Sequence, residues 1–216
     1  MGRKIHNSCK FDKIDLLLKF IKIHKIDLDA EVEKVYTKGK HSRHYFNFIA
    51  KKHNVHVTGP YIIYDSCDTK IPENWYTDKE YTIVPVYIVS SEGNHQNVIL
   101  INWNKKIIER FEPLAYSTFD EYCDVTEILK RMFKDFTILT SENMLPIQKY
   151  QEMEKRDIKD GLCIGWSCFF VDIRLTFNDL DTETIINKVF DELNNGCGLS
   201  SFIIKYLNYL YVNCFT

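Results

Sequence analysis

The sequence predicts an α+β fold in which a central β-hairpin is packed by helices. Residues 81–89, 97–103 and 107–111 are rich in β-branched and aromatic side chains, which is typical of strands. Residues 11–24 carry apolar side chains at helical spacing, and residues 163–177 read as a helix that is apolar on almost every side. No linker, repeat or low-complexity tract separates these segments, and 216 residues with 45% hydrophobic content can form one core. We therefore predict a single domain over residues 1–216.

The first eighty residues are predicted to be a helical N-terminal extension or cap. An amphipathic helix is expected over residues 11–24, because lysines lie between its apolar positions. Shorter helices are expected over residues 30–36 and 45–49. The basic residues 38–44 beside these helices are interpreted as a solvated face.

Residues 81–181 are predicted to form the core of the domain. A turn at Asn104-Lys105-Lys106 joins the last two strands, so that His95 lies before the first strand of the hairpin and Glu112 after the second. A helix over residues 121–133, a strand over 136–139 and an almost wholly apolar helix over 163–177 follow. Two further helices, over residues 182–194 and 199–211, form a C-terminal unit spanning residues 182–216.

Composition excludes several classes of function. A net charge of -2 gives no general attraction to nucleic acid. The apolar run over residues 16–21 is too short to span a bilayer. Seven scattered cysteines without a C-x-x-C pair indicate neither a disulfide framework nor a zinc site. We expect a protein of a reducing intracellular compartment that needs no metal or cofactor.

Two cysteines near the start of the apolar helix are candidates for a reactive thiol. Cys163 lies at the predicted helix start, where backbone N–H groups and the helix dipole favour a thiolate. Cys168 lies more than one turn further in, where burial makes a thiol unreactive. The alternative interpretation is that both cysteines are unreactive, small buried side chains. Cys163 is the better candidate for a nucleophile, with Asp160 as a helix cap.

A cysteine nucleophile needs a base, an orienting carboxylate and donors for the oxyanion. His95 is the candidate base, although a loop histidine is more often solvated. Glu112 is the candidate acid because the two ends of an antiparallel hairpin lie side by side. Glu109 competes with it from inside the strand, and a surface ion pair of either glutamate with Arg110 is the plain alternative.

Gln148 is the candidate oxyanion donor, because a neutral amide holds an oxyanion without adding charge to the resting site. Gln151 is the alternative donor. Either amide could instead be a solvent-facing loop side chain.

The order His95, Glu112, Gln148 and Cys163 resembles the cysteine peptidases of clan CE, which include the SUMO-specific proteases and the adenovirus endopeptidase (adenain). In that family the histidine begins one strand, the acid ends the next, and a glutamine precedes a cysteine at the head of the central helix. The resemblance implies a papain-like fold of the adenain and SUMO-protease type. Its central mixed sheet would be packed by helices, with the nucleophile at the start of a buried central helix.

The segments HQNVILINWNKKIIERFEP and DGLCIGWSCFFVDIRLTFNDL are similar to peptidase-like proteins of large DNA viruses. The resemblance covers residues 81–181. The chain departs from clan CE in having Gln96 where tryptophan often follows the histidine, and Gly165 where glycine commonly follows the cysteine directly. The interval from Gln148 to Cys163 is also longer than in the SUMO proteases, so Gln151 remains an alternative oxyanion donor.

The resemblance implies a thiol peptidase that hydrolyses peptide or isopeptide bonds after a small residue such as glycine. Its protein substrates would be ubiquitin, ubiquitin-like modifiers or viral precursors, in the host cytoplasm or the virion. Substrate-binding roles fall to Trp166 and Trp103, with Trp75 a further candidate, as walls of a narrow aromatic tunnel that admits glycine. The alternatives are an acetyltransferase of clan CE type that uses acetyl-coenzyme A, or a non-catalytic binding module with the same fold.

Overall fold

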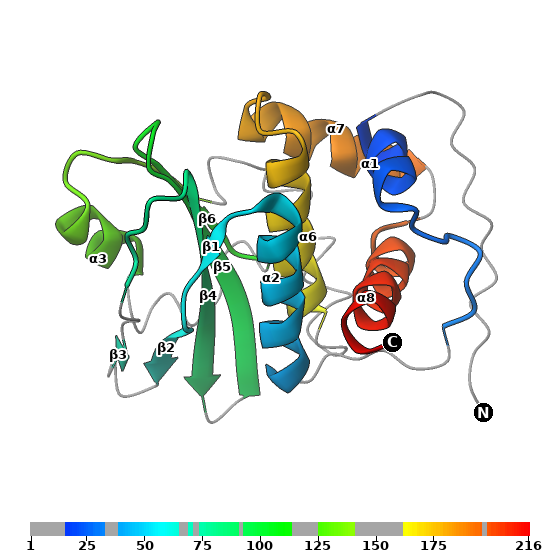
Figure 1. Ribbon diagram of the computed structural model, residues 1–216, viewed down its shortest axis with the longest axis horizontal. Coiled ribbons are helices and arrows are strands. Elements are labelled where there is room, and N and C mark those ends of the chain that lie inside the picture. The colour runs from blue at the N-terminus through cyan, green and yellow to red at the C-terminus, as the bar shows by residue number, and fades with distance from the viewer. Residues whose placement is uncertain are drawn as a thin grey trace.

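The computed structural model describes residues 16–32, 39–64, 69–70, 74–90, 93–113, 125–140, 162–195 and 198–216. A mixed sheet lies beside a layered group of helices (Figure 1). The predicted α+β class with a mixed sheet is confirmed. In chain order the elements are α1 (Leu16–His24), α2 (Gly39–His53), β1 (His56–Val57), β2 (Tyr61–Tyr64), β3 (Thr69–Lys70), β4 (Tyr81–Ser90), β5 (Gly93–Asn102), β6 (Ile107–Phe111), α3 (Val125–Met132), β7 (Thr137–Thr140), α6 (Cys163–Thr176), α7 (Thr182–Asn195) and α8 (Leu199–Phe215).

Strand β5 lies in the middle of the sheet. The strand order is β3-β2-β4-β5-β6-β7, and β1 pairs separately with β4. Antiparallel pairing joins β4 to β5 and β5 to β6, whereas β2 pairs parallel with β4 and β7 parallel with β6. The predicted turn at Asn104-Lys105-Lys106 joins β5 to β6. Lys106 has a positive φ of 52 there, which is typical of a tight turn between antiparallel strands. The long β4–β5–β6 meander therefore fixes the positions of residues near the start of β5 and the end of β6.

The residues before Tyr81 contribute strands as well as helices. β1 and β2 both pair with β4, and α2 is much longer than the helix expected over residues 45–49. Residues 30–32 are not helical, and the remainder of the helix expected over 30–36 lies outside the described residues. The run Tyr61–Tyr64 was not predicted as a strand because four apolar residues give too short a pattern to separate strand from helix.

Helix α6 is buried on nearly every side, as its apolar sequence predicts. It lies between the sheet and the helices α1, α7 and α8, with α2 alongside it (Figure 1). Phe170 stacks on Phe111 of the sheet at 4.5 Å between ring centroids. A Cβ placed on Gly165 would lie 2.6 Å from Ile203 Cγ2 of α8, so glycine at this position permits the close approach of the two helices.

A second apolar cluster covers the opposite face of the sheet. Trp75, Trp103 and the α3 residue Leu129 pack there against β4, β5 and β6. The indole Nε1 of Trp103 donates to Thr82 Oγ1 at 2.9 Å. Both tryptophans therefore belong to this structural cluster.

Two ionic groups with buried carboxylates connect α6 to its neighbours. Arg174 of α6 binds both carboxylate oxygens of Glu109 at 2.9 Å. Asp172, also on α6, accepts from Lys52 Nζ at 2.6 Å and Tyr206 Oη at 2.9 Å and lies 2.7 Å from His53 Nε2. Because these partners come from α2 and α8, Asp172 joins three helices through one carboxylate.

Candidate active site

Glu112 holds two side chains of β5 through its two carboxylate oxygens. Its Oε1 lies 2.5 Å from His95 Nε2, and its Oε2 accepts from Asn97 Nδ2 at 2.7 Å. The register Val98↔Phe111 explains this arrangement, because one step further along the pairing brings Asn97 opposite Glu112. His95, two residues from Asn97, lies on the same side of β5. All three side chains are buried.

The predicted position of His95 before the strand is wrong, because β5 begins at Gly93 and includes it. The predicted position of Glu112 directly after β6 is confirmed. Glu109, the competing acid, forms an ion pair with Arg174 and also accepts a hydrogen bond from Thr182 Oγ1 at 2.7 Å. The sheet therefore brings Glu112, and not Glu109, to His95.

The surroundings of His95 favour the imidazolium form. Burial lowers its pKa, but the charge of Glu112 and hydrogen bonds to Cys163 and Glu112 outweigh burial and raise the pKa to about 10. Since Nε2 faces Glu112, Nδ1 is the ring nitrogen left for Cys163. His95 therefore connects a carboxylate on one side to a thiol on the other.

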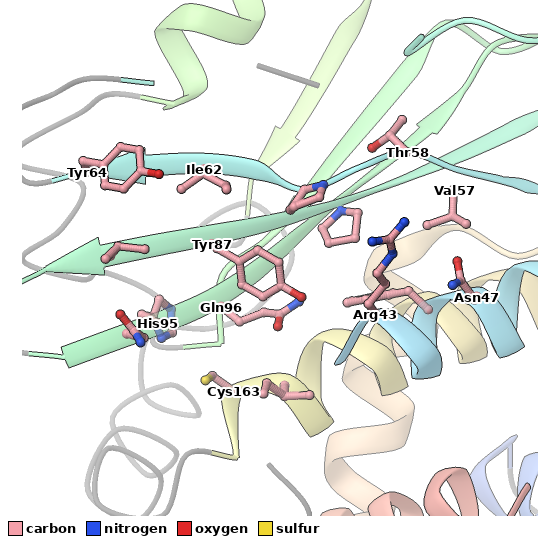
Figure 2. A pocket seen from close by; sticks show the side chains of 16 residues that line it. Arg43, Asn47, Val57, Thr58, Ile62, Tyr64, Tyr87, His95, Gln96 and Cys163 are labelled. Atoms are coloured by element: carbon pink, nitrogen blue, oxygen red, sulfur yellow. The ribbon is translucent and has the colours of Figure 1, made fainter. Parts of the chain in front are cut away.

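Cys163 is the first residue of α6 and is a half-buried free thiol. The preceding N-cap residue is Leu162, which has no side-chain acceptor for the first N–H groups of the helix. Figure 2 shows the thiol at the helix start, on the same side of the pocket as His95. Cys168, in contrast, is fully buried, and burial raises its pKa well above the ordinary value. The geometry thus separates the two cysteines in the way their helix positions predict.

A pocket of about 830 Å³ opens directly beside Cys163 and His95 (Figure 2). Helix α2 forms one wall with Arg43, Phe46 and Asn47, and strands of the sheet form the other. The apolar part of the sheet wall comes from β1, β2, β4 and the loop between β1 and β2: Val57, Pro60, Ile62, Tyr64, Pro85 and Val89.

The tunnel residues proposed from sequence do not line this pocket. Trp166 is 1% exposed and stacks on Phe190 of α7 at 5.5 Å, inside the helical core. Trp103 and Trp75 lie in the cluster on the far face of the sheet. Their aromatic character indicated a binding wall, but all three side chains lie in apolar clusters instead: Trp166 on α6, Trp103 in the turn after β5, and Trp75 outside the helices and strands. The pocket that the structure does show combines aliphatic side chains with Phe46, Tyr64 and Tyr87, and it contains no tryptophan.

Three sequence candidates lie outside the described residues: Gln148, Gln151 and Asp160. Conversely, sequence reasoning missed Asn97 as a partner of Glu112. The signal available for Asn97 was its spacing of two from His95, which places both on one side of a strand.

Gln96, the residue at which this chain departs from the clan CE pattern after the histidine, lines the pocket with its side chain. It alternates with His95 along β5 and pairs across the strands with Tyr87 of β4.

Within the described residues, no cluster of three or more His, Cys, Asp or Glu is arranged to hold a metal ion. In the same part of the chain, every helix is too short or too polar to cross a membrane.

Comparison with known proteins gives distant similarities. No protein-family model matches the chain. The putative ankyrin repeat protein L371 of Acanthamoeba polyphaga mimivirus is 27% identical over 151 residues, covering 59% of this chain and 20% of that protein. This chain therefore corresponds to about a fifth of the length of its viral relative. Neither this similarity nor the structural one below assigns the chain to a family.

Among solved structures, ChlaDub1 from Chlamydia trachomatis aligns over 97% of this chain and 96% of its own. The sequence identity is 11% and the TM-score 0.34.

Proposed function

We propose that this protein is a thiol peptidase in which Cys163 is the nucleophile, His95 the general acid and base, and Glu112 the residue that orients His95. The observation that carries the proposal is the buried His95–Glu112 pair, at 2.5 Å, whose histidine also hydrogen-bonds to Cys163 at the start of a helix. A thiol, an imidazole and a carboxylate in this sequence of contacts form the arrangement that nucleophilic acyl transfer requires.

In the proposed mechanism Cys163 attacks as a thiolate beside a His95 imidazolium, which the charge of Glu112 stabilises. The thiolate attacks the scissile carbonyl carbon and forms a C–S bond. His95 gives its proton to the leaving amine as the C–N bond breaks, leaving an acyl-enzyme. Water then attacks the acyl carbon while His95 takes one of its protons, and cleavage of the C–S bond regenerates the thiolate.

The oxyanion of each tetrahedral intermediate would be held by the backbone N–H of Cys163 and by the amide of Gln148, with Gln151 as the alternative donor. Backbone N–H groups in the first turn of a helix have no acceptor within the helix and can donate to such an oxyanion. Removing one oxyanion donor from an acyl-transfer site costs about 100- to 1,000-fold in kcat. Gln148→Ala and Gln151→Ala, compared side by side, identify the donor by which of them shows this loss.

The proposed substrates are proteins, with ubiquitin, ubiquitin-like modifiers and viral precursor proteins as the candidate classes. The test is a panel of probes that carry a C-terminal electrophile on ubiquitin and its relatives, with intact-mass detection. Wild-type protein and Cys168→Ala should form an adduct, and Cys163→Ala and His95→Ala should not.

Two outcomes would replace the proposal. Acetyl transfer from acetyl-coenzyme A to a partner protein, with no cleavage of any peptide or modifier substrate, would identify an acetyltransferase. Tight binding of a modifier without an adduct at either cysteine would identify a binding module.

A further inference from the structure

The pocket beside Cys163 has room and apolar lining for a bulky side chain. Its volume of about 830 Å³ is far larger than a glycine requires. It falls in the range of sites that enclose sizeable ligands, about 300–1,000 Å³. Aliphatic side chains on β1, β2 and β4 line one wall, and Ile164 follows Cys163 on α6. An apolar group placed there would remain next to the reactive thiol.

The amide of Gln96 is held in one orientation at this pocket. Its Oε1 accepts from Ser42 Oγ at 2.7 Å, and Ser42 is fully buried on α2. Tyr87, the cross-strand neighbour of Gln96, also hydrogen-bonds to Ser42. This chain of contacts uses the oxygen end of the amide and leaves the NH₂ end free to donate.

No acceptor for Gln96 Nε2 exists in the described part of the chain, although the side chain is 2% exposed. A buried donor without an acceptor is unfavourable and is rare in native proteins. Gln96 adjoins His95 and lines the same pocket as Cys163 (Figure 2). A peptide lying beside that thiol would bring backbone carbonyl groups, which are the acceptors common to all peptides.

We propose that this pocket binds a bulky apolar side chain of an extended peptide substrate, and that Gln96 Nε2 donates a hydrogen bond to a backbone carbonyl of that peptide. The inference rests on the proposed peptidase function and specifies its substrate class. The apolar wall selects the side chain, and Gln96 fixes the register of the backbone.

The test is a positional-scanning library of internally quenched octapeptides, assayed with wild type, Gln96→Met and Gln96→Glu. Wild type should prefer leucine or phenylalanine over glycine by about tenfold or more at one position near the cleaved bond, because the pocket buries that side chain. Gln96→Met should lower kcat/KM about tenfold, mainly through KM, since it removes a binding hydrogen bond at nearly constant volume. Gln96→Glu keeps the oxygen for Ser42 but loses the donor, and should show a loss at least as large.

Two controls separate binding from misfolding. Alkylation of Cys163 by iodoacetamide, which needs no subsite, should proceed at the wild-type rate in Gln96→Met. Asn213→Met makes a similar exchange on the exposed face of α8 and should leave kcat/KM unchanged.

Cleavage that favours glycine at every position, or an unchanged kcat/KM in Gln96→Met, would overturn the subsite while leaving the peptidase function intact. Absence of cleavage and of any adduct at Cys163 would overturn both.

Discussion

Replacing Glu112 by glutamine should convert His95 from an imidazolium to a neutral imidazole at pH 7. Burial alone lowers the pKa of His95, and the negative charge of Glu112 is the largest influence that raises it. A rise from 6.5 to about 10 corresponds to roughly 5 kcal/mol in favour of the charged form. When Cys163 is also replaced by alanine, removing that charge leaves burial as the main influence on His95, so its pKa should fall below 6.5.

The measurement is an NMR titration of the His95 imidazole in two proteins that both carry Cys163→Ala, which removes the contribution of the thiol. The chain has seven histidines, so His95→Gln assigns the signal. With Glu112 present the pKa should lie well above 6.5, and with Glu112→Gln it should lie below 6.5. Glu109→Gln is the matched control, because its carboxylate on neighbouring β6 binds Arg174 and not His95. The same pKa with and without Glu112 would refute the reasoning.

Three further predictions concern the supporting residues. Asn97→Leu frees one oxygen of Glu112 and should slow labelling of Cys163 by a peptide electrophile about ten- to a hundredfold; an unchanged rate would contradict a positioning role. Asp172→Asn leaves the partly buried Lys52 without its counter-charge and should cost about 3 kcal/mol in denaturant unfolding, whereas Lys130→Gln in an exposed pair should cost under about 1 kcal/mol. Burial lowers the pKa of His24 to about 4, so the unfolded chain binds a proton first as pH falls below 6.5. The free energy of unfolding should therefore decrease as the pH falls from 6.5 to 4, and it should decrease less steeply in His24→Gln. Equal pH dependence of the unfolding free energy in the two proteins would contradict this prediction.

Most of the correct predictions of secondary structure and burial came from the strand and helix periodicity of residues 81–181. The β5–β6 register follows from a tight turn between two β-rich runs, and this register is what brings Glu112 to His95. The almost continuous apolar character of α6 predicted its burial. Local patterns were sufficient here because the contacts join neighbouring strands.

Contacts between distant segments were not predictable in the same way. Ser42 on α2 meets Gln96 on β5, and Asp172 on α6 meets Lys52 on α2, through packing of elements far apart in sequence. The direction of the Trp166 side chain depended on the packing of α6 against α7, which follows later in the sequence. Trp166 faces Phe190 of α7 for that reason, although its proximity to Cys163 in sequence indicated a site residue.

The activation of Cys163 by His95 is tested most directly by the rate at which iodoacetamide alkylates Cys163 at pH 6, followed by peptide-mapping mass spectrometry. Wild-type Cys163 should react rapidly because the adjacent imidazolium favours the thiolate, and Cys168 should remain unmodified because it is fully buried. In His95→Ala the rate at Cys163 should fall about a hundredfold or more. Equal rates in the two proteins, or faster alkylation of Cys168 than of Cys163, would contradict the account.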